Sequence, residues 1–257
     1  MAKKNDPLTK TAYASVKTSE DVAKFLFYFS IALSLIILFV DEFTNAWTYQ
    51  TVQILFFLAT LCLFFCRIAT NLYWSARAHE GRYTDLLSHA FQVPLSVDTS
   101  TGYYNNQESN TYRRLAATIL ENALFSKEVS RGMLAIERWK IGLYSVIWVI
   151  CALIRGTEIS FITLIAQIIL SQDILERWIK LEWLRDQFEK TYLSAFALIQ
   201  SSTDFSTREF SGRSIQLVVR YETIKAKAGI SLSTKVFNKI NASVSDEWKR
   251  TKVILNL

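Results

Sequence analysis

The strongest constraint on this chain is the distribution of its charges around four apolar segments. These segments contain no Asp, Glu, Lys or Arg, and they are Phe25–Val40, Phe43–Cys66, Ile141–Ile154 and Ile159–Gln172. They form two close pairs, separated by two residues in the first pair and by four in the second. Each pair is therefore expected to form a helical hairpin that enters and leaves a bilayer on the same side.

Basic residues lie almost entirely on one side of these hairpins. Of the 29 Lys and Arg residues, 28 fall in residues 1–24, 67–140 and 173–257, and only Arg155 falls in a short connection. Positively charged loops stay in the cytoplasm during insertion. The sequence therefore predicts an all-α membrane protein with two transmembrane helical hairpins (four spans), a helical cytosolic domain and cytoplasmic termini.

This layout divides the chain into five parts. They are a basic cytosolic N-terminal tail (1–24), the first transmembrane hairpin (25–66), a cytosolic helical hairpin that contains the sensing segment (67–140), the second transmembrane hairpin (141–172) and a cytosolic C-terminal helical region (173–257). In the third part we expect a helix from Arg67 to Val93 that Pro94 ends, a polar loop, and a helix from Thr111 to Lys140. That last helix leads directly into the third span.

The second hairpin leaves an alternative open. Each of its arms has 14 residues, whereas roughly 20 apolar residues are needed to cross a bilayer. It could therefore be a buried hairpin, or one that dips into the membrane and returns. Trp139 and Trp178 flank the pair as interfacial aromatic residues would, which favours four full spans.

The polar loop and the helices beside it have the chemistry of a nucleotide site. Arginine binds phosphate with two parallel hydrogen bonds, Tyr rings stack on bases, and Asn amides pair with base edges. The candidate ligand residues are Arg77, Arg82, Tyr103, Tyr104, Asn105, Asn106, Arg113 and Arg114. In the alternative interpretation, these arginines contact lipid headgroups and the loop is a solvated turn.

Polar side chains inside the spans are few. The candidates to line a pore are Ser30, Ser34, Gln53, Thr60, Thr163 and Gln167. Such residues also form hydrogen bonds between helices, which is their commoner use. Because no ionisable residue lies in the middle of a span, a proton-coupled transporter is disfavoured.

The sequence does not indicate an enzyme, a metal site or a cofactor. It contains no P-loop, no Gly-x-Ser-x-Gly and no Cys-x-x-Cys, and its two histidines do not share a helix face. A lipid-modifying enzyme would need a polar cluster at the membrane face. His79, Asp85 and His89 are the only candidates for it.

The run from Ala76 to Asp85, followed by Phe91-Gln92-Val93-Pro94-Leu95, adds a family resemblance. Together with the two hairpins around a cytosolic segment, it resembles the SMODS-associated four-transmembrane effectors and, more loosely, their two-span SLATT-type relatives. The resemblance implies a role in bacterial antiphage defence by abortive infection. In that role, a partner nucleotidyltransferase makes an oligonucleotide that controls a membrane effector.

From these features we expect a homo-oligomeric effector of the bacterial inner membrane, with a tetramer favoured. Its expected partners are membrane lipids, a cyclic or linear oligonucleotide and the cognate nucleotidyltransferase. It would act by forming a pore or ion channel or by disrupting the membrane. The main alternative is a non-conducting, membrane-anchored scaffold that recruits a cytosolic partner protein.

Overall fold

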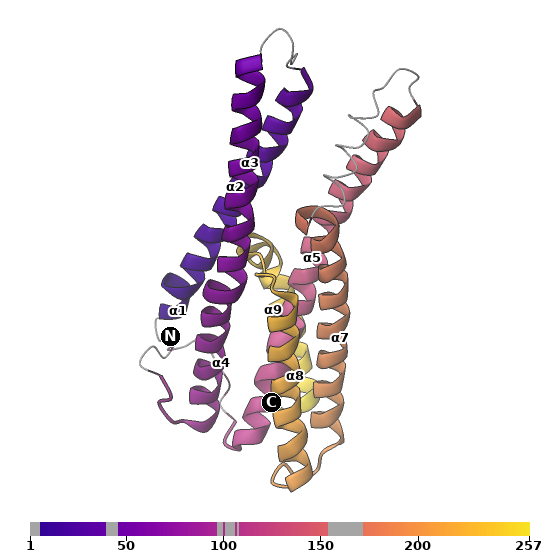
Figure 1. Ribbon diagram of the computed structural model, residues 1–257. Helices are drawn as coiled ribbons and strands as arrows, with labels where there is room; N and C mark the ends of the chain where they lie inside the picture. The colour runs from indigo at the N-terminus through magenta and orange to yellow at the C-terminus, as the bar shows by residue number, and fades with distance from the viewer. Residues whose placement is uncertain (1–5, 40–45, 97–99, 101–105, 107, 154–171) are drawn as a thin grey trace. The chain divides into compact units, whose positions relative to one another are not determined.

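The computed structural model describes residues 6–39, 46–96, 100, 106, 108–153 and 172–257, and none of these forms a strand. Figure 1 shows the elements in chain order: α1 (Pro7–Lys10), α2 (Ala12–Phe39), α3 (Ala46–Ala69), the π-helical turn η1 (Thr70–Ser75), α4 (Ala76–Phe91), α5 (Thr111–Leu153), the π-helical turn η2 (Gln172–Glu176), α7 (Arg177–Ser201), α8 (Arg208–Ala228) and α9 (Thr234–Leu255). Over this part of the chain the predicted all-α fold is confirmed.

The chain divides into two compact units. Unit 1 consists of Met1–Lys10, His79–Ile136 and Trp178–Leu257, and unit 2 consists of Thr11–Ala78 and Glu137–Arg177. Three of the boundaries fall inside helices, so α4, α5 and α7 each continue from one unit into the other. The π-helical turns η1 and η2 lie just before two of these boundaries, and such turns commonly mark functional irregularities in helices.

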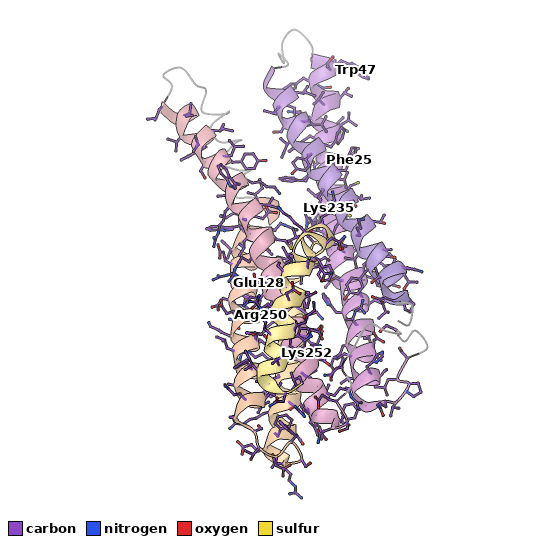
Figure 2. The ribbon with its side chains drawn as sticks, turned by 180° about the vertical axis from the view of Figure 1, so that it is seen from behind. Phe25, Trp47, Glu128, Lys235, Arg250 and Lys252 are labelled. Carbon is purple, nitrogen blue, oxygen red and sulfur yellow. The ribbon has the colours of Figure 1, made fainter. Side chains whose placement is uncertain are left out.

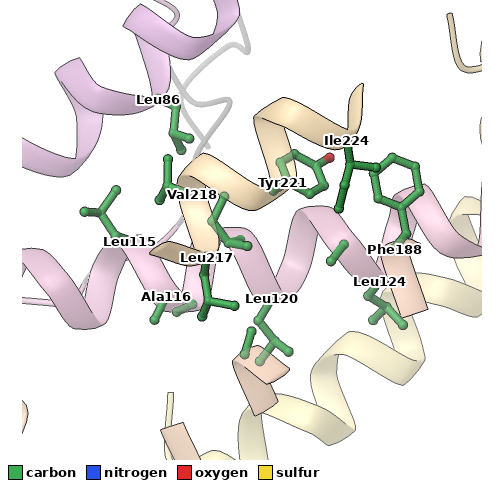
Figure 3. Packing of buried hydrophobic residues seen from close by; sticks show 14 of the residues in the cluster. Leu86, Leu115, Ala116, Leu120, Leu124, Phe188, Leu217, Val218, Tyr221 and Ile224 are labelled. Carbon is green, nitrogen blue, oxygen red and sulfur yellow. The ribbon is translucent and has the colours of Figure 1, made fainter. Parts of the chain in front are cut away.

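Unit 1 has a dense hydrophobic core. Figure 3 shows Leu120 and Leu124 of α5 in one cluster with Phe188 of α7 and Tyr221 of α8, and the side chain of Phe188 is fully buried. Leu86 brings α4 into the same cluster. Burying an aliphatic or aromatic side chain of this size stabilises a fold by about 1.5–3 kcal/mol, so this core is sufficient to hold the unit's helices together.

The helix predicted from Arg67 to Val93 is present as the continuation of the second apolar segment, and it ends two residues earlier than predicted. Helical residues run without a break from Ala46 to Phe91, through η1. Gln92 then adopts a left-handed conformation with φ of 56°, which is a common way to end a helix. The residue before a proline also disfavours helical geometry, so Pro94 limits how far the helix could continue.

In unit 1, α8 and α9 form a helical hairpin with defined caps. Thr207 accepts a hydrogen bond from the Phe210 amide at the start of α8, and Gly229 ends that helix with φ of 58°. Ser233 caps α9 by accepting from the Val236 amide. Since both ends of the connection are capped, the turn between the two helices is short and locally specified.

In unit 2, α2 and α3 pack side by side and leave large apolar side chains exposed. Trp47 is 83% exposed, Phe25 67% and Phe57 64%. Among the described residues, one helix, Ala46–Phe91, is long and apolar enough to cross a membrane, and only 6% of its most apolar stretch is buried. By length and composition, this part of the chain therefore contains one candidate span, and the four predicted spans are not confirmed. The predicted fourth span, Ile159–Gln172, lies outside the described residues except for the backbone of Gln172.

Candidate functional site

The predicted ligand loop is tied to α4 through Asp85. This carboxylate is fully buried and accepts hydrogen bonds from Ser100, at 2.8 Å from the backbone amide and 2.6 Å from the hydroxyl. The guanidinium of Arg82 lies 3.7 Å from Asp85 and donates to Asp6 at 2.8 Å. Burial raises the pKa of Asp6, but the hydrogen bonds from Arg82 and Thr9 outweigh it, so this pKa lies below its ordinary value.

Arg114 stabilises the end of α4. Its Nη1 donates to the carbonyl oxygen of Ala90 at 2.9 Å and lies 3.4 Å from that of His89, while its Nε donates to the Glu108 carbonyl at 2.8 Å. The last carbonyls of a helix have no partner within the helix and carry partial negative charge. Arg114 therefore fixes the end of α4 to the start of α5. Asn106 supports this arrangement by donating to the Arg114 carbonyl at 3.1 Å.

Arg113, the neighbouring residue, has a different set of partners. It forms an ion pair with Glu108 at 3.0 Å and donates to the Asn256 carbonyl at 2.6 Å. Its guanidinium also lies 4.4 Å from the centre of the Phe205 ring. Arg113 thus connects the start of α5 to the end of α9 and to the α7–α8 connection.

The predicted nucleotide residues therefore fall into three groups. Four of them are engaged with protein groups inside unit 1: Arg82, Asn106, Arg113 and Arg114. Arg77 is exposed and belongs to unit 2. Three lie outside the described residues: Tyr103, Tyr104 and Asn105. Sequence reasoning missed the structural use of Arg114. One signal for that use was available in the sequence. An arginine stands at the start of the helix that follows the one ended near Pro94.

The polar residues proposed to line a pore bond mainly to their own helices where they are described. Ser30 donates to the Leu26 carbonyl at 2.8 Å, and Thr60 donates to the Phe56 carbonyl at 2.8 Å. Such local bonds satisfy a hydroxyl in an apolar environment. Ser34 is half-buried and Gln53 is exposed. Two more candidates lie outside the described residues: Thr163 and Gln167.

Unit 2 contains a charge cluster that the sequence analysis did not anticipate. Glu137, only 6% exposed, accepts from Arg177 at 3.3 Å and from Lys140 at 3.2 Å. Arg67 in turn interacts electrostatically with Arg177, Glu20 and Glu176. The cluster has three carboxylates and three cations, so its charges balance. We call this set the basal charge cluster: Glu20, Arg67, Glu137, Lys140, Glu176 and Arg177.

A short polar contact joins α2 to the α3–η1 region beside this cluster. The Ser19 hydroxyl lies 2.6 Å from that of Thr70, and the Cys66 thiol donates to the Ser19 carbonyl at 3.6 Å. Thr70 also donates to the Cys66 carbonyl at 2.7 Å. These bonds satisfy hydroxyls at the point where the helix changes from α to π geometry.

Unit 1 also contains a polar group between α4 and α8, made up of His79, Glu222 and Lys225. The Lys225 ammonium donates to Glu222 at 2.8 Å; burial nevertheless lowers the pKa of Lys225, while Glu222 acts in the opposite direction. Burial, followed by the charge of Lys225, lowers the pKa of His79 to about 4. His79 is therefore neutral at physiological pH, too weak a base to be matched to proton transfer near pH 7.

Among the described residues, no group of three or more His, Cys, Asp or Glu side chains is placed to hold a metal ion. Two polar arrangements are candidates for a functional role. They are the contacts of Arg113 and Arg114 at the start of α5 in unit 1, and the basal charge cluster of unit 2. No family model, no curated protein and no solved structure matches this chain.

Proposed function

We propose that this chain is a multi-pass effector of the bacterial inner membrane, in which a helical cytosolic unit controls a membrane-perturbing assembly. In this proposal all four apolar segments cross the bilayer. Residues 67–140 and 173–257 lie in the cytoplasm, and the segment 67–140 responds to an anionic nucleotide or oligonucleotide made by a partner nucleotidyltransferase. The response opens a pore or disrupts the membrane, as abortive infection requires.

The course of α5 is the observation that carries this proposal. The helix has 43 residues, so it is about 65 Å long. Its first half provides core residues such as Leu120 and Leu124, which are fully buried. Its last part exposes apolar residues, with Leu143 at 57% and Leu153 at 76%. One helix therefore contributes buried core residues to unit 1 and exposed apolar residues, compatible with lipid, to unit 2.

The basal charge cluster supports the four-span layout. Each of its members lies within five residues of the cytosolic end of one of the predicted apolar segments. If all four segments cross the bilayer, these charges share one depth at the cytosolic membrane surface, where ion pairs are tolerated. Their observed interactions across α2, α3, α5 and α7 fit that arrangement.

Topology can be tested with single introduced cysteines in a variant that lacks the three native ones. A membrane-impermeant maleimide should label Asp41→Cys in cells whose outer membrane has been permeabilised. It should label Ser109→Cys only after the inner membrane is opened as well. Labelling of Ser109→Cys before that step would place residues 67–140 outside and would overturn the proposal.

Ligand control can be tested at Arg77, because its side chain is exposed and its loss should leave the fold intact. Purified full-length Arg77→Ala should bind a cyclic oligonucleotide at least about tenfold more weakly than the wild type, since one charge-assisted phosphate contact is worth roughly 1.5–3 kcal/mol. The matched control is Arg208→Ala, another exposed arginine. Equal affinity in the wild type and both variants would remove Arg77 from the site.

Membrane activity provides the other test. Expression of the chain without its regulator should depolarise cells, and a tetramer should be the species detected by mass measurement in detergent. Retention of the full membrane potential under every ligand condition would contradict the pore.

A membrane-anchored scaffold is the second candidate, and one observation favours it. Arg82, Arg113 and Arg114 all bond to groups of the protein itself, so they serve the fold of unit 1. Unit 1 would then present a fixed helical surface to a cytosolic partner protein. Stable co-purification of such a partner, without depolarisation, would support the scaffold.

A further inference from the structure

We infer that the α8–α9 turn of unit 1 is a contact site for anionic lipid headgroups, formed by Lys227, Lys235 and Lys239. This inference rests on the proposed membrane location and adds a lipid ligand to it. The site lies at one end of unit 1, and the contacts that support it are all within that unit.

The turn packs against α5 close to the point where that helix leaves unit 1. The Ser233 amide donates to the Met133 sulfur at 3.3 Å. Val236 lies so close to Gly132 that an added Cβ there would be 2.5 Å from it, so only glycine allows this approach. Unit 1 ends on α5 at Ile136, only three residues after Met133.

The other two helices that leave unit 1 do so near the same end of α8. His79, the first residue of unit 1 on α4, interacts electrostatically with Lys225. On α7, Trp183 lies five residues after the boundary, and its ring centre is 5.8 Å from the Lys227 ammonium. All three connections to the apolar segments therefore leave unit 1 around this turn.

The three lysines of the turn are exposed, and none of them forms an ion pair with the described part of the chain. Lys225 differs, because its side chain is only 16% exposed and is paired with Glu222 at 2.8 Å. Unit 1 as a whole carries 21 Lys and Arg against 15 Asp and Glu, whereas unit 2 carries eight of each. The turn thus concentrates unpaired positive charge on the unit that has the excess.

An exposed tryptophan further along α5 favours lipid over a soluble anion as the ligand. Trp139, 81% exposed, comes six residues after Met133 in the sequence. Tryptophan at such a position is typical of the membrane interface. A lysine side chain can extend toward the interface while its stem covers apolar surface. Near an anionic bilayer each basic residue strengthens binding roughly fivefold.

Hydrogen exchange on the full-length protein in lipid nanodiscs tests this inference. Discs of phosphatidylcholine alone are compared with discs that contain phosphatidylglycerol. Exchange in residues 228–240 should slow by at least about fivefold in the anionic discs, the factor expected from a single basic residue. The effect should weaken at high salt, because salt screens exposed charges.

The test variant and its control each lose three positive charges. Replacing Lys227, Lys235 and Lys239 by Gln should abolish the lipid-dependent slowing. The matched control replaces Arg208, Lys249 and Arg250, which are also exposed. Figure 2 shows Lys235 at one end of α9 and Arg250 toward the other, and their separation of 15 positions corresponds to about 22 Å along the helix. The control should keep the full effect.

Three results would overturn the inference: equal exchange in both kinds of disc, equal loss in both variants, or slowing by a soluble oligonucleotide in neutral discs without any effect of phosphatidylglycerol. These outcomes are separate from failure of the proposed function. A chain that does not enter nanodiscs at all would contradict the membrane location itself.

Discussion

Similar aromatic side chains are buried in unit 1 and exposed in unit 2. In unit 1 the ring of Phe188 is fully buried and lies 5.4 Å from the ring of Tyr221, centre to centre. In unit 2, Phe25 and Phe57 are 67% and 64% exposed, although their helices pack together. Water disfavours an exposed apolar surface of that extent, and lipid does not. This difference is what the proposed location of unit 2 in the membrane predicts.

Ion pairs do not follow this contrast, because each unit contains both exposed and shielded pairs. Unit 1 has exposed ion pairs such as Lys190–Asp186, with 56% and 44% of the two side chains exposed, and these contribute little to stability. In unit 2 the Glu137 carboxylate is 8% exposed and its partner Arg177 is 27% exposed. A pair held away from water depends strongly on both members, so the exposure of a pair determines its expected contribution in either unit.

The largest effect that would test this contrast comes from two matched phenylalanines. Phe188→Ala should destabilise unit 1 by about 3–5 kcal/mol, because it leaves a cavity in a close-packed core. Phe57→Ala should cost less than about 1 kcal/mol in detergent or lipid, since its ring faces solvent in either case. Chemical denaturation of the full-length protein in detergent measures both. Equal losses would show that the exposed face of α3 is covered in the folded protein.

The buried carboxylate of unit 1 should give the next largest effect. Asp85→Ala removes the acceptor for both hydrogen bonds from Ser100 and one carboxylate beside Arg82. The loss should be about 3 kcal/mol, because buried donors are left without partners. Asp186→Ala, the control, loses an exposed pair and should cost no more than about 1 kcal/mol. If Asp85→Ala loses no more stability than the control, the carboxylate does not hold Ser100 in place.

In unit 2 the basal charge cluster should be more sensitive than its partial exposure suggests. Glu137→Ala leaves Arg177 and Lys140 without their shared acceptor and should cost about 2 kcal/mol. Hydrogen exchange should then become faster in residues 137–140. Glu209→Ala, which breaks an exposed pair with Arg213, is the control and should leave exchange near Glu137 unchanged. Unchanged exchange in Glu137→Ala would mean that the cluster contributes no local stability.

Much of the fold was accessible from the sequence because apolar periodicity and helix breakers act locally. Pro94 illustrates this, since the helix ends within two residues of its predicted end. The apolar stretch of α3 was identified from composition alone, and its helix is the one that qualifies as a span among the described residues. The mixing of separate chain stretches within each unit was not predicted, because it depends on tertiary packing.

The site was less predictable, because one residue type serves several purposes. Arg114 has the chemistry of a phosphate ligand, yet its hydrogen bonds go to the carbonyls at the end of α4. The partners of Glu137 and Arg67 come from other helices, and no sequence spacing reveals them. Among the predicted ligand residues that the structure describes, Arg77 is the one that is exposed.

The pH dependence of stability should reveal the contribution of the buried His79, and this is the smallest of the expected effects. His79 has a pKa of about 4 in the folded protein, lowered from its ordinary value of 6.5 by burial and then by Lys225. Between these values the unfolded chain binds a proton that the folded chain does not. Stability therefore falls as pH drops below 6.5, by about 1–2 kcal/mol between pH 7 and pH 5.

Denaturation of the wild type and His79→Gln at both pH values measures this contribution. The variant should lose that much less stability on acidification, because glutamine does not titrate. Asp6 does not interfere, since its folded pKa lies below 3.8 and its stabilising contribution disappears only as pH falls through that lower value. The same loss in both proteins would show that His79 reaches solvent in the folded state, and the polar group between α4 and α8 would then be open to water.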